Sequence, residues 1–184
     1  MTPDEQKFMA FEGLLGWTAA VVTQAKRVSA ARDKLFATLR QRSYPKLNSE
    51  LILRRLAQQF FQTERQLFCN AANQLLQYRQ WVQRLGFLDD ALFDELDKFA
   101  DDIDVMRDMN EHAIEYFEGK GKRPHDWVYQ GEGATSDASS TVETKIGGRL
   151  DWVELGSAAQ RLLARISQMG PFFPRDSGQH MAEK

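Results

Sequence analysis

The sequence predicts a mainly α-helical protein, a bundle of four to five helices with long antiparallel members and a small β-hairpin inserted before the last helix. Apolar residues recur at steps of three and four over residues 4–42 and 48–85, which is the spacing of one face of a helix. Helix-breaking residues such as Pro45, Gly86 and Pro171 separate the helical stretches. A segment rich in glycine, serine and β-branched residues interrupts the helical pattern near residues 127–147.

Length and composition bound the class of protein. The 184 residues fit one domain, which we expect over residues 1–170, followed by a disordered tail at 171–184. A net charge of −2 gives no overall attraction to nucleic acid or to anionic membranes, so any RNA site must be local. No apolar run approaches the ~20 residues of a membrane span, and the start lacks the basic region of a signal peptide. We therefore expect a cytoplasmic protein without membrane contact, in which the single cysteine, Cys69, is buried.

The first two helices follow from their apolar spacing. The first is expected over residues 4–42, where Gly13 and Gly16 would allow close contact with a neighbouring helix. The second is expected from the N-cap Asn48 to Leu85. Its predicted buried stripe comprises Ile52, Leu56, Phe60, Leu67, Ala71, Leu75, Val82 and Leu85. Glu64 falls inside this stripe, so we expect it to pair with a cation or to lie at the wet edge.

The remaining elements complete the predicted bundle. A third helix is expected from Asp89 or Asp90 to about Glu118. Its predicted face comprises Leu92, Leu96, Phe99, Ile103, Met106, Asn110, Ala113 and Phe117. Residues 127–130 and 142–146 are expected to pair as a hairpin around a mobile loop at 131–141. The last helix should start at the capping box Asp151–Glu154 and end at Gly170.

One segment of the third helix combines residue types that can do chemistry. At about 100° per residue, Asp108 and His112 are neighbours one turn apart on the side away from the core, and Arg107 lies on the flank near Glu111. The structural interpretation is a solvated face with weak helix salt bridges. The functional interpretation is that a carboxylate orients the imidazole for proton transfer while a guanidinium binds phosphate.

The run Arg107-Asp108-Met109-Asn110-Glu111-His112 resembles the signature of HEPN domains, which is Arg, then Asn, Asp or His, three variable residues and His. The resemblance covers roughly residues 1–120, and HEPN domains are also helical bundles with the motif on a late core helix. It implies a metal-independent endoribonuclease of toxin or defence type. The resemblance also implies that two copies of the chain form the site as a homodimer. In this homodimer Arg107 would hold the scissile phosphate, His112 would transfer a proton and Asp108 would orient the site. No cofactor or metal is implied.

Three further interpretations accompany this one. Lys120, Lys122 and Arg123 follow the motif and would bind the RNA backbone, or they would simply complement the helix dipole. The chain is alternatively a non-catalytic HEPN-like interaction or ligand-binding module, acting with a partner subunit. A metal site on Asp104, Asp108, His112 and Glu115 is the third interpretation, disfavoured because these residues face outward from one helix.

Overall fold

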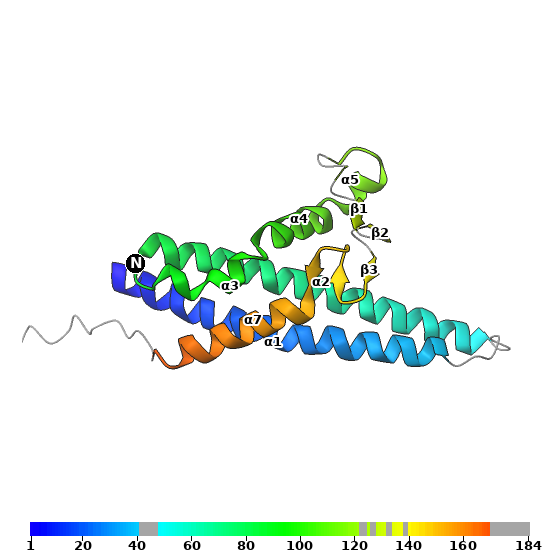
Figure 1. The fold of residues 1–184 in the computed structure, drawn as a ribbon, viewed down its shortest axis with the longest axis horizontal. Coiled ribbons are helices and arrows are strands. Elements are labelled where there is room, and N and C mark those ends of the chain that lie inside the picture. Colours follow the sequence, from blue (N-terminus) through cyan, green and yellow to red (C-terminus); the bar gives the residue numbers. More distant parts are fainter. Residues whose placement is uncertain (41–47, 122–124, 126–127, 132–133, 138–139, 170–184) are drawn as a thin grey trace, which may run out of the picture.

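The computed structural model describes residues 1–40, 48–121, 125, 128–131, 134–137 and 140–169, and it confirms the mainly helical class. Two long antiparallel helices, α1 (Pro3–Arg40) and α2 (Asn48–Leu85), run side by side along the length of the molecule (Figure 1). Their bounds agree with the predicted ones. Each has 38 residues and is therefore about 57 Å long. No helix in the described ranges is long and apolar enough to cross a membrane.

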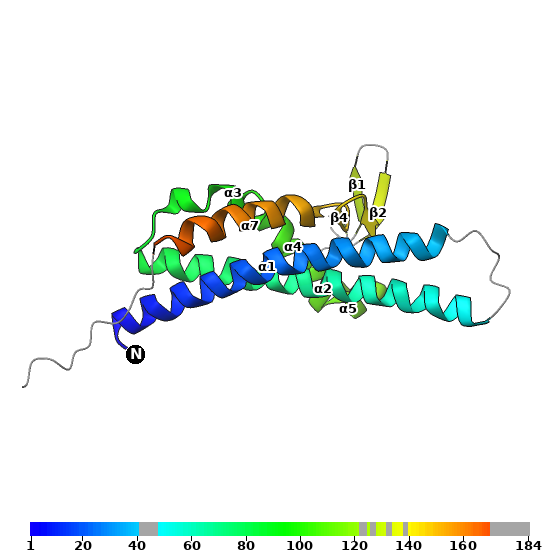
Figure 2. The same cartoon turned by 90° about the horizontal axis from the view of Figure 1, so that it is seen from below.

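Helices α1 and α2 together form a helical hairpin. The last helix, α7 (Trp152–Ser167), packs along one half of this hairpin (Figure 2). Asp151 caps it as predicted, because its carboxylate accepts hydrogen bonds from the backbone N–H groups of Val153 and Glu154. The fully buried Trp152 fixes the start of α7. Its indole N–H donates to Ser29 Oγ of α1 at 3.0 Å, and its ring meets Phe61 of α2 edge-on with centroids 6.2 Å apart.

The segment predicted as one third helix is broken into four, so that prediction is wrong in its continuity. It consists of the 3₁₀ turn η1 (Asp90–Leu92) and the helices α3 (Asp94–Asp97), α4 (Ala100–Glu111) and α5 (Ala113–Phe117). Asp89 caps η1 by accepting from the Ala91 N–H at 3.0 Å, a local bond that competes with continuous helix. The buried Phe93 separates η1 from α3.

The predicted face of this segment holds only for its first part. Ile103 and Met106 are buried as predicted, but the third buried residue of α4 is Met109. Asn110 and Phe117, which were predicted on the buried face, are exposed. Because α4 ends at Glu111, the helical spacing that placed Phe117 on the buried face does not continue to it.

The strands pair differently from the prediction. Strands β1 (Val128–Gly131) and β2 (Ala134–Asp137) form one antiparallel hairpin, so β2 lies inside the predicted loop. Strands β3 (Thr141–Val142), β4 (Lys145–Ile146) and β5 (Leu150–Asp151) form a separate antiparallel sheet. The predicted strand 142–146 is interrupted by a turn in which Glu143 has a φ of 54°. The predicted pairing of 127–130 with 142–146 is therefore wrong, because strands joined by a short turn pair with each other first.

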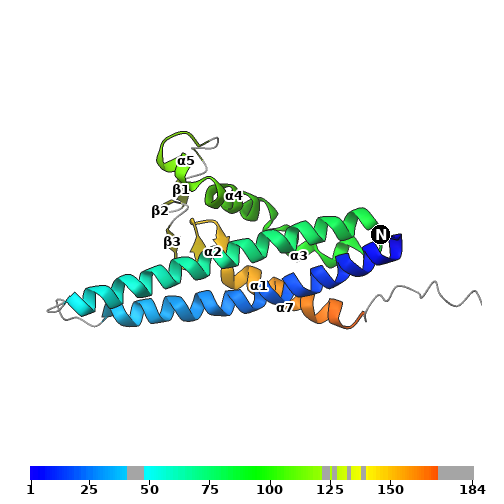
Figure 3. The ribbon, with the colours of Figure 1, turned by 180° about the vertical axis from the view of Figure 1, so that it is seen from behind.

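The buried stripe of α2 also differs from the predicted one in its first half. The side chains that face the core there are Ala57, Phe61, Glu64 and Phe68. The predicted Ile52, Leu56, Phe60 and Leu67 are between 44% and 58% exposed. Each step of four residues turns about 40° around a helix, so a chain of such steps drifts away from the core side. In Figures 1 and 3 the end of the hairpin near Arg40 extends beyond the other elements.

Candidate functional site

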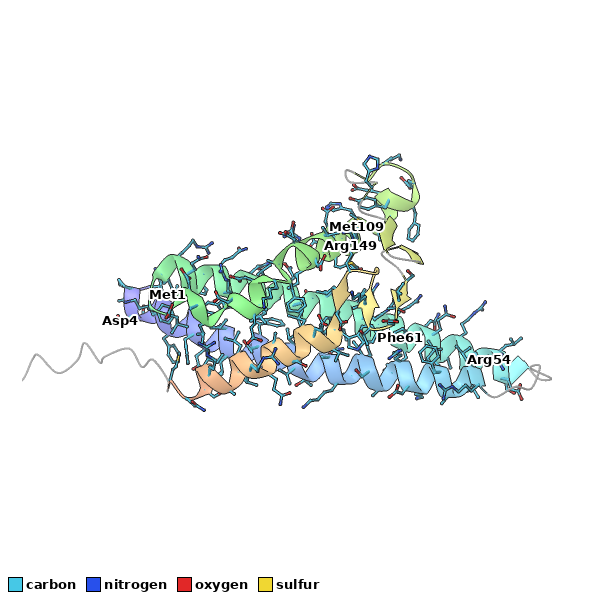
Figure 4. The ribbon with its side chains drawn as sticks, viewed as in Figure 1. Met1, Asp4, Arg54, Phe61, Met109 and Arg149 are labelled. Atoms are coloured by element: carbon cyan, nitrogen blue, oxygen red, sulfur yellow. The ribbon has the colours of Figure 1, made fainter. Side chains whose placement is uncertain are left out.

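The motif lies where α4 crosses α2 and continues into α5 (Figures 1 and 3). Met109 is buried on the side of α4 that faces the hairpin, and Figure 4 marks its position. The three predicted catalytic residues, Arg107, Asp108 and His112, are all partly exposed. The side chains of Arg107 and His112 have exposed fractions of 36% and 39%. They are thus within reach of a ligand or of another chain.

Arg107 is held by two carboxylates on its own helix. Its Nη2 lies 2.9 Å from Asp104 Oδ1, and its Nε lies 3.9 Å from Glu111 Oε2. The contact with Glu111 is the predicted neighbour at i+4. Both carboxylates are substantially exposed, so each ion pair contributes only ~0.2–1 kcal/mol. The two ion pairs therefore position the guanidinium of Arg107, but breaking either of them costs little free energy.

Asp108 and His112 have separate partners. The Asp108 carboxylate accepts a hydrogen bond from Tyr116 Oη at 2.9 Å. The Nδ1 atom of His112 lies 3.2 Å from Glu115 Oε1. His112 is the residue between α4 and α5, with φ −111° and ψ 22°, and its backbone N–H still donates to the Asp108 carbonyl at 3.0 Å. The carboxylate that orients the imidazole is thus Glu115, where the sequence pointed to Asp108. Tyr116, which holds Asp108, was not predicted.

The approach to the motif carries negative charge. Asp101, Asp102 and Asp104 occupy the first turns of α4. Burial raises the pKa of Asp102, while the nearby cations Arg149 and Lys145 oppose that shift. A phosphate that approaches Arg107 from the start of α4 therefore meets repulsion.

Of the predicted RNA-binding lysines and arginine, the structure describes Lys120. Its Nζ lies 2.8 Å from Glu118 Oε2, and its side chain is 72% exposed. Lys122 and Arg123 lie outside the described residues. The basic cluster therefore stays a prediction.

The residues of the hypothetical metal site have other contacts. Asp104 binds Arg107, Asp108 binds Tyr116, and Glu115 lies against His112. Within the described ranges, no group of three or more histidine, cysteine, aspartate or glutamate side chains is arranged to hold a metal ion.

Two other residues singled out from the sequence lie in the hairpin. Glu64 is 1% exposed, and its carboxylate accepts hydrogen bonds from Gln24 Nε2 and, at 2.8 Å, from Arg27 Nη2. It pairs with a cation, one of the two outcomes expected. Cys69 is buried as expected. Glu64 links α2 to α1, and Cys69 belongs to the hydrophobic core.

Comparisons of the chain with models of protein families, with curated proteins and with solved structures found no match.

Proposed function

We propose that the chain is a HEPN-like, metal-independent endoribonuclease that acts as a homodimer, with Arg107 and His112 at the composite site. One observation carries this proposal. The two motif side chains are partly exposed, and the helix that follows, α5, carries two large apolar side chains, Ile114 and Phe117, that are 74% and 72% exposed. Exposed apolar side chains beside reactive ones are typical of a surface that another chain covers. The resemblance of Arg107–His112 to the HEPN signature supports a second copy as that chain.

In the proposed reaction the ribose 2′-oxygen attacks phosphorus while the bond to the 5′-oxygen breaks. An imidazole of His112 takes the proton of the 2′-hydroxyl or gives one to the leaving 5′-oxygen, as general acid–base catalysis requires. Glu115, 3.2 Å from Nδ1, would keep the other ring nitrogen, Nε2, directed at the substrate. The guanidinium of Arg107 would stabilise the charge on the phosphate oxygens.

The ion pairs of Arg107 are compatible with this role. Phosphate binding requires the guanidinium to leave Asp104 or Glu111, and exposed pairs of this kind are weak. A bidentate contact with a phosphate is the stronger interaction. Covering by a second copy would also reduce screening by water and strengthen the bond to the phosphate.

The proposal is tested by RNA cleavage in the presence of a metal chelator. We expect Arg107→Ala and His112→Ala each to lower the cleavage rate by about a hundredfold or more. The control is Arg161→Ala, which removes another exposed arginine that is also in an ion pair, with Glu95. Cleavage by either motif variant at the wild-type rate would contradict the assigned roles.

The acidic surroundings of Arg107 favour a second candidate, a non-catalytic HEPN-like module that binds a partner subunit or ligand. Asp104 and Glu111 already neutralise the guanidinium, and more aspartates precede it on α4. This candidate predicts a dimer or heteromer that leaves RNA intact. Size-exclusion chromatography combined with the cleavage assay separates the two candidates, because a dimer that leaves RNA intact fits only the non-catalytic module.

A further inference from the structure

A cavity of about 440 Å³ lies between the first half of α2, the end of α1 and the start of β3. None of the motif residues lines it. Its described lining consists of Leu35, Leu39, Leu51, Arg54, Arg55, Gln58, Phe61, Gln62, Arg65, Ser140 and Thr141. In Figure 4, Phe61 lies below β3 and Arg54 lies further toward the end of the hairpin. The volume is within the range of roughly 300–1,000 Å³ found for small-molecule sites.

The lining is cationic. It contains three arginines, Arg54, Arg55 and Arg65, while none of the described residues that line it is an aspartate or a glutamate. The whole chain has a net charge of −2. This concentration of guanidinium groups is therefore a local feature, and it favours an anion with several oxygen atoms, which arginines bind in bidentate fashion.

The arginines lie on one stripe of α2, because they and the intervening lining residues recur at steps of three and four from Leu51 to Arg65. Arg65 is built into the fold. It is only 7% exposed, and its guanidinium carbon lies 5.0 Å from the centroid of the Phe61 ring. The helix fixes the spacing of the three arginines and burial fixes the side chain of Arg65 before a ligand binds, which lowers the entropic cost of binding.

The rest of the lining has two kinds of side chain. Leu35, Leu39 and Leu51 offer apolar surface, which an inorganic ion would leave unused. The amides of Gln58 and Gln62 and the hydroxyls of Ser140 and Thr141 can donate hydrogen bonds to oxygen atoms. Such a cavity suits a molecule with an apolar body and an oxygen-rich anionic group.

We propose that this cavity binds an organic phosphate, with the phosphate on the arginines and the organic body on Leu35, Leu39 and Leu51. A phosphate monoester carries about −1.5 to −2 charges at neutral pH and three acceptor oxygens, which matches several guanidinium groups better than a carboxylate does. This site does not depend on the proposed ribonuclease activity, because it shares no residue with the motif.

The test measures the binding of three probes with one body to the full-length protein by calorimetry: naphthyl phosphate, naphthoate and naphthol. We expect saturable binding of naphthyl phosphate, with naphthoate and naphthol each at least about tenfold weaker. Absence of saturable binding, or equal affinity for naphthoate, would overturn the proposal.

Variants locate the site. Arg54→Gln combined with Arg55→Gln should weaken the binding of naphthyl phosphate about tenfold or more, since these side chains are at least partly exposed and their replacement leaves the core intact. Arg84→Gln, on an exposed position of the same helix, should leave binding unchanged. An equal loss in Arg84→Gln, or no loss in the double variant, would show that naphthyl phosphate does not bind in this cavity.

Discussion

At the scale of single residues, the two buried groups Glu64 and Cys69 of α2 lie in different environments. The carboxylate of Glu64 is bound by Gln24 and Arg27 of α1, so a charge inside the interface between α1 and α2 has two donors. The thiol of Cys69 has a different environment. Burial raises the pKa of Cys69 to about 12, and the opposing effects of Arg65 and of a hydrogen bond with Asn110 are smaller.

The raised pKa of Cys69 predicts an inert thiol in the native protein. Its usual pKa is 9.0, so at pH 8 the thiolate fraction in the folded state is about a thousandfold lower than in the unfolded chain, and the reaction with a thiol reagent should be slower by about that factor. The neutral thiol stabilises the fold below pH 9, and this contribution is lost as the pH rises from 9 toward 12. The rate of absorbance change with a chromogenic disulfide, with and without urea, checks this. Equal rates would show an accessible thiol.

At the scale of elements, helix packing depends on small residues at particular contacts. A Cβ atom added to Gly156 of α7 would lie 2.6 Å from the Cβ atom of Ala25 of α1. A Cβ atom added to Gly13 would meet the Tyr78 ring, whereas one added to Gly16 would meet nothing within 4 Å. The expected close contact therefore exists at Gly13 and is absent at Gly16.

These contacts predict opposite effects for two alanine substitutions. Gly156→Ala should lower the free energy of unfolding by about 1 kcal/mol, because the methyl group of Ala25 cannot turn away and overpacking exceeds the gain in helix propensity. Gly16→Ala should raise it by about 1 kcal/mol, because only the gain in propensity remains. Urea unfolding of both variants checks this. Equal stability of the two would mean that α7 does not pack on α1 at Ala25.

Apolar spacing and helix-ending residues predicted the bounds of α1 and α2, since these signals are local. The buried side of α2 could not be predicted, because apolar residues surround its first turns at 51–53, 56–57 and 60–61. The packing of α1 and α7 decides which of them face inward. At the motif, the contact of Arg107 with Glu111 followed from helical spacing. The spacing also placed Glu115 on the face of His112, but it did not show that Glu115 rather than Asp108 contacts the imidazole, because α4 ends at Glu111 and Tyr116 binds Asp108.

At the scale of the whole molecule, the motif and the arginine-lined cavity are separate surfaces. The motif lies at the end of α4, just before the exposed Ile114 and Phe117 of α5, while the cavity lies along the first half of α2. The cavity could not be predicted from the sequence, because Ser140 and Thr141 line it together with residues of α1 and α2. The pairing of the strands that places these two residues there was not predictable. Its signal in the sequence was the stripe of Arg54, Arg55 and Arg65.

The proposed composite site requires two copies of the chain to meet at the motif, and cross-linking tests this directly. Glu111 is exposed and lies beside Arg107, so Glu111→Cys places a reactive thiol in the proposed interface, while the native Cys69 is buried and inert. With a short bismaleimide, we predict a cross-linked species of twice 21.1 kDa for Glu111→Cys and none for Gln160→Cys, on an exposed position of α7. A Glu111→Cys protein that stays monomeric, or a Gln160→Cys protein that cross-links as readily, would contradict the composite site.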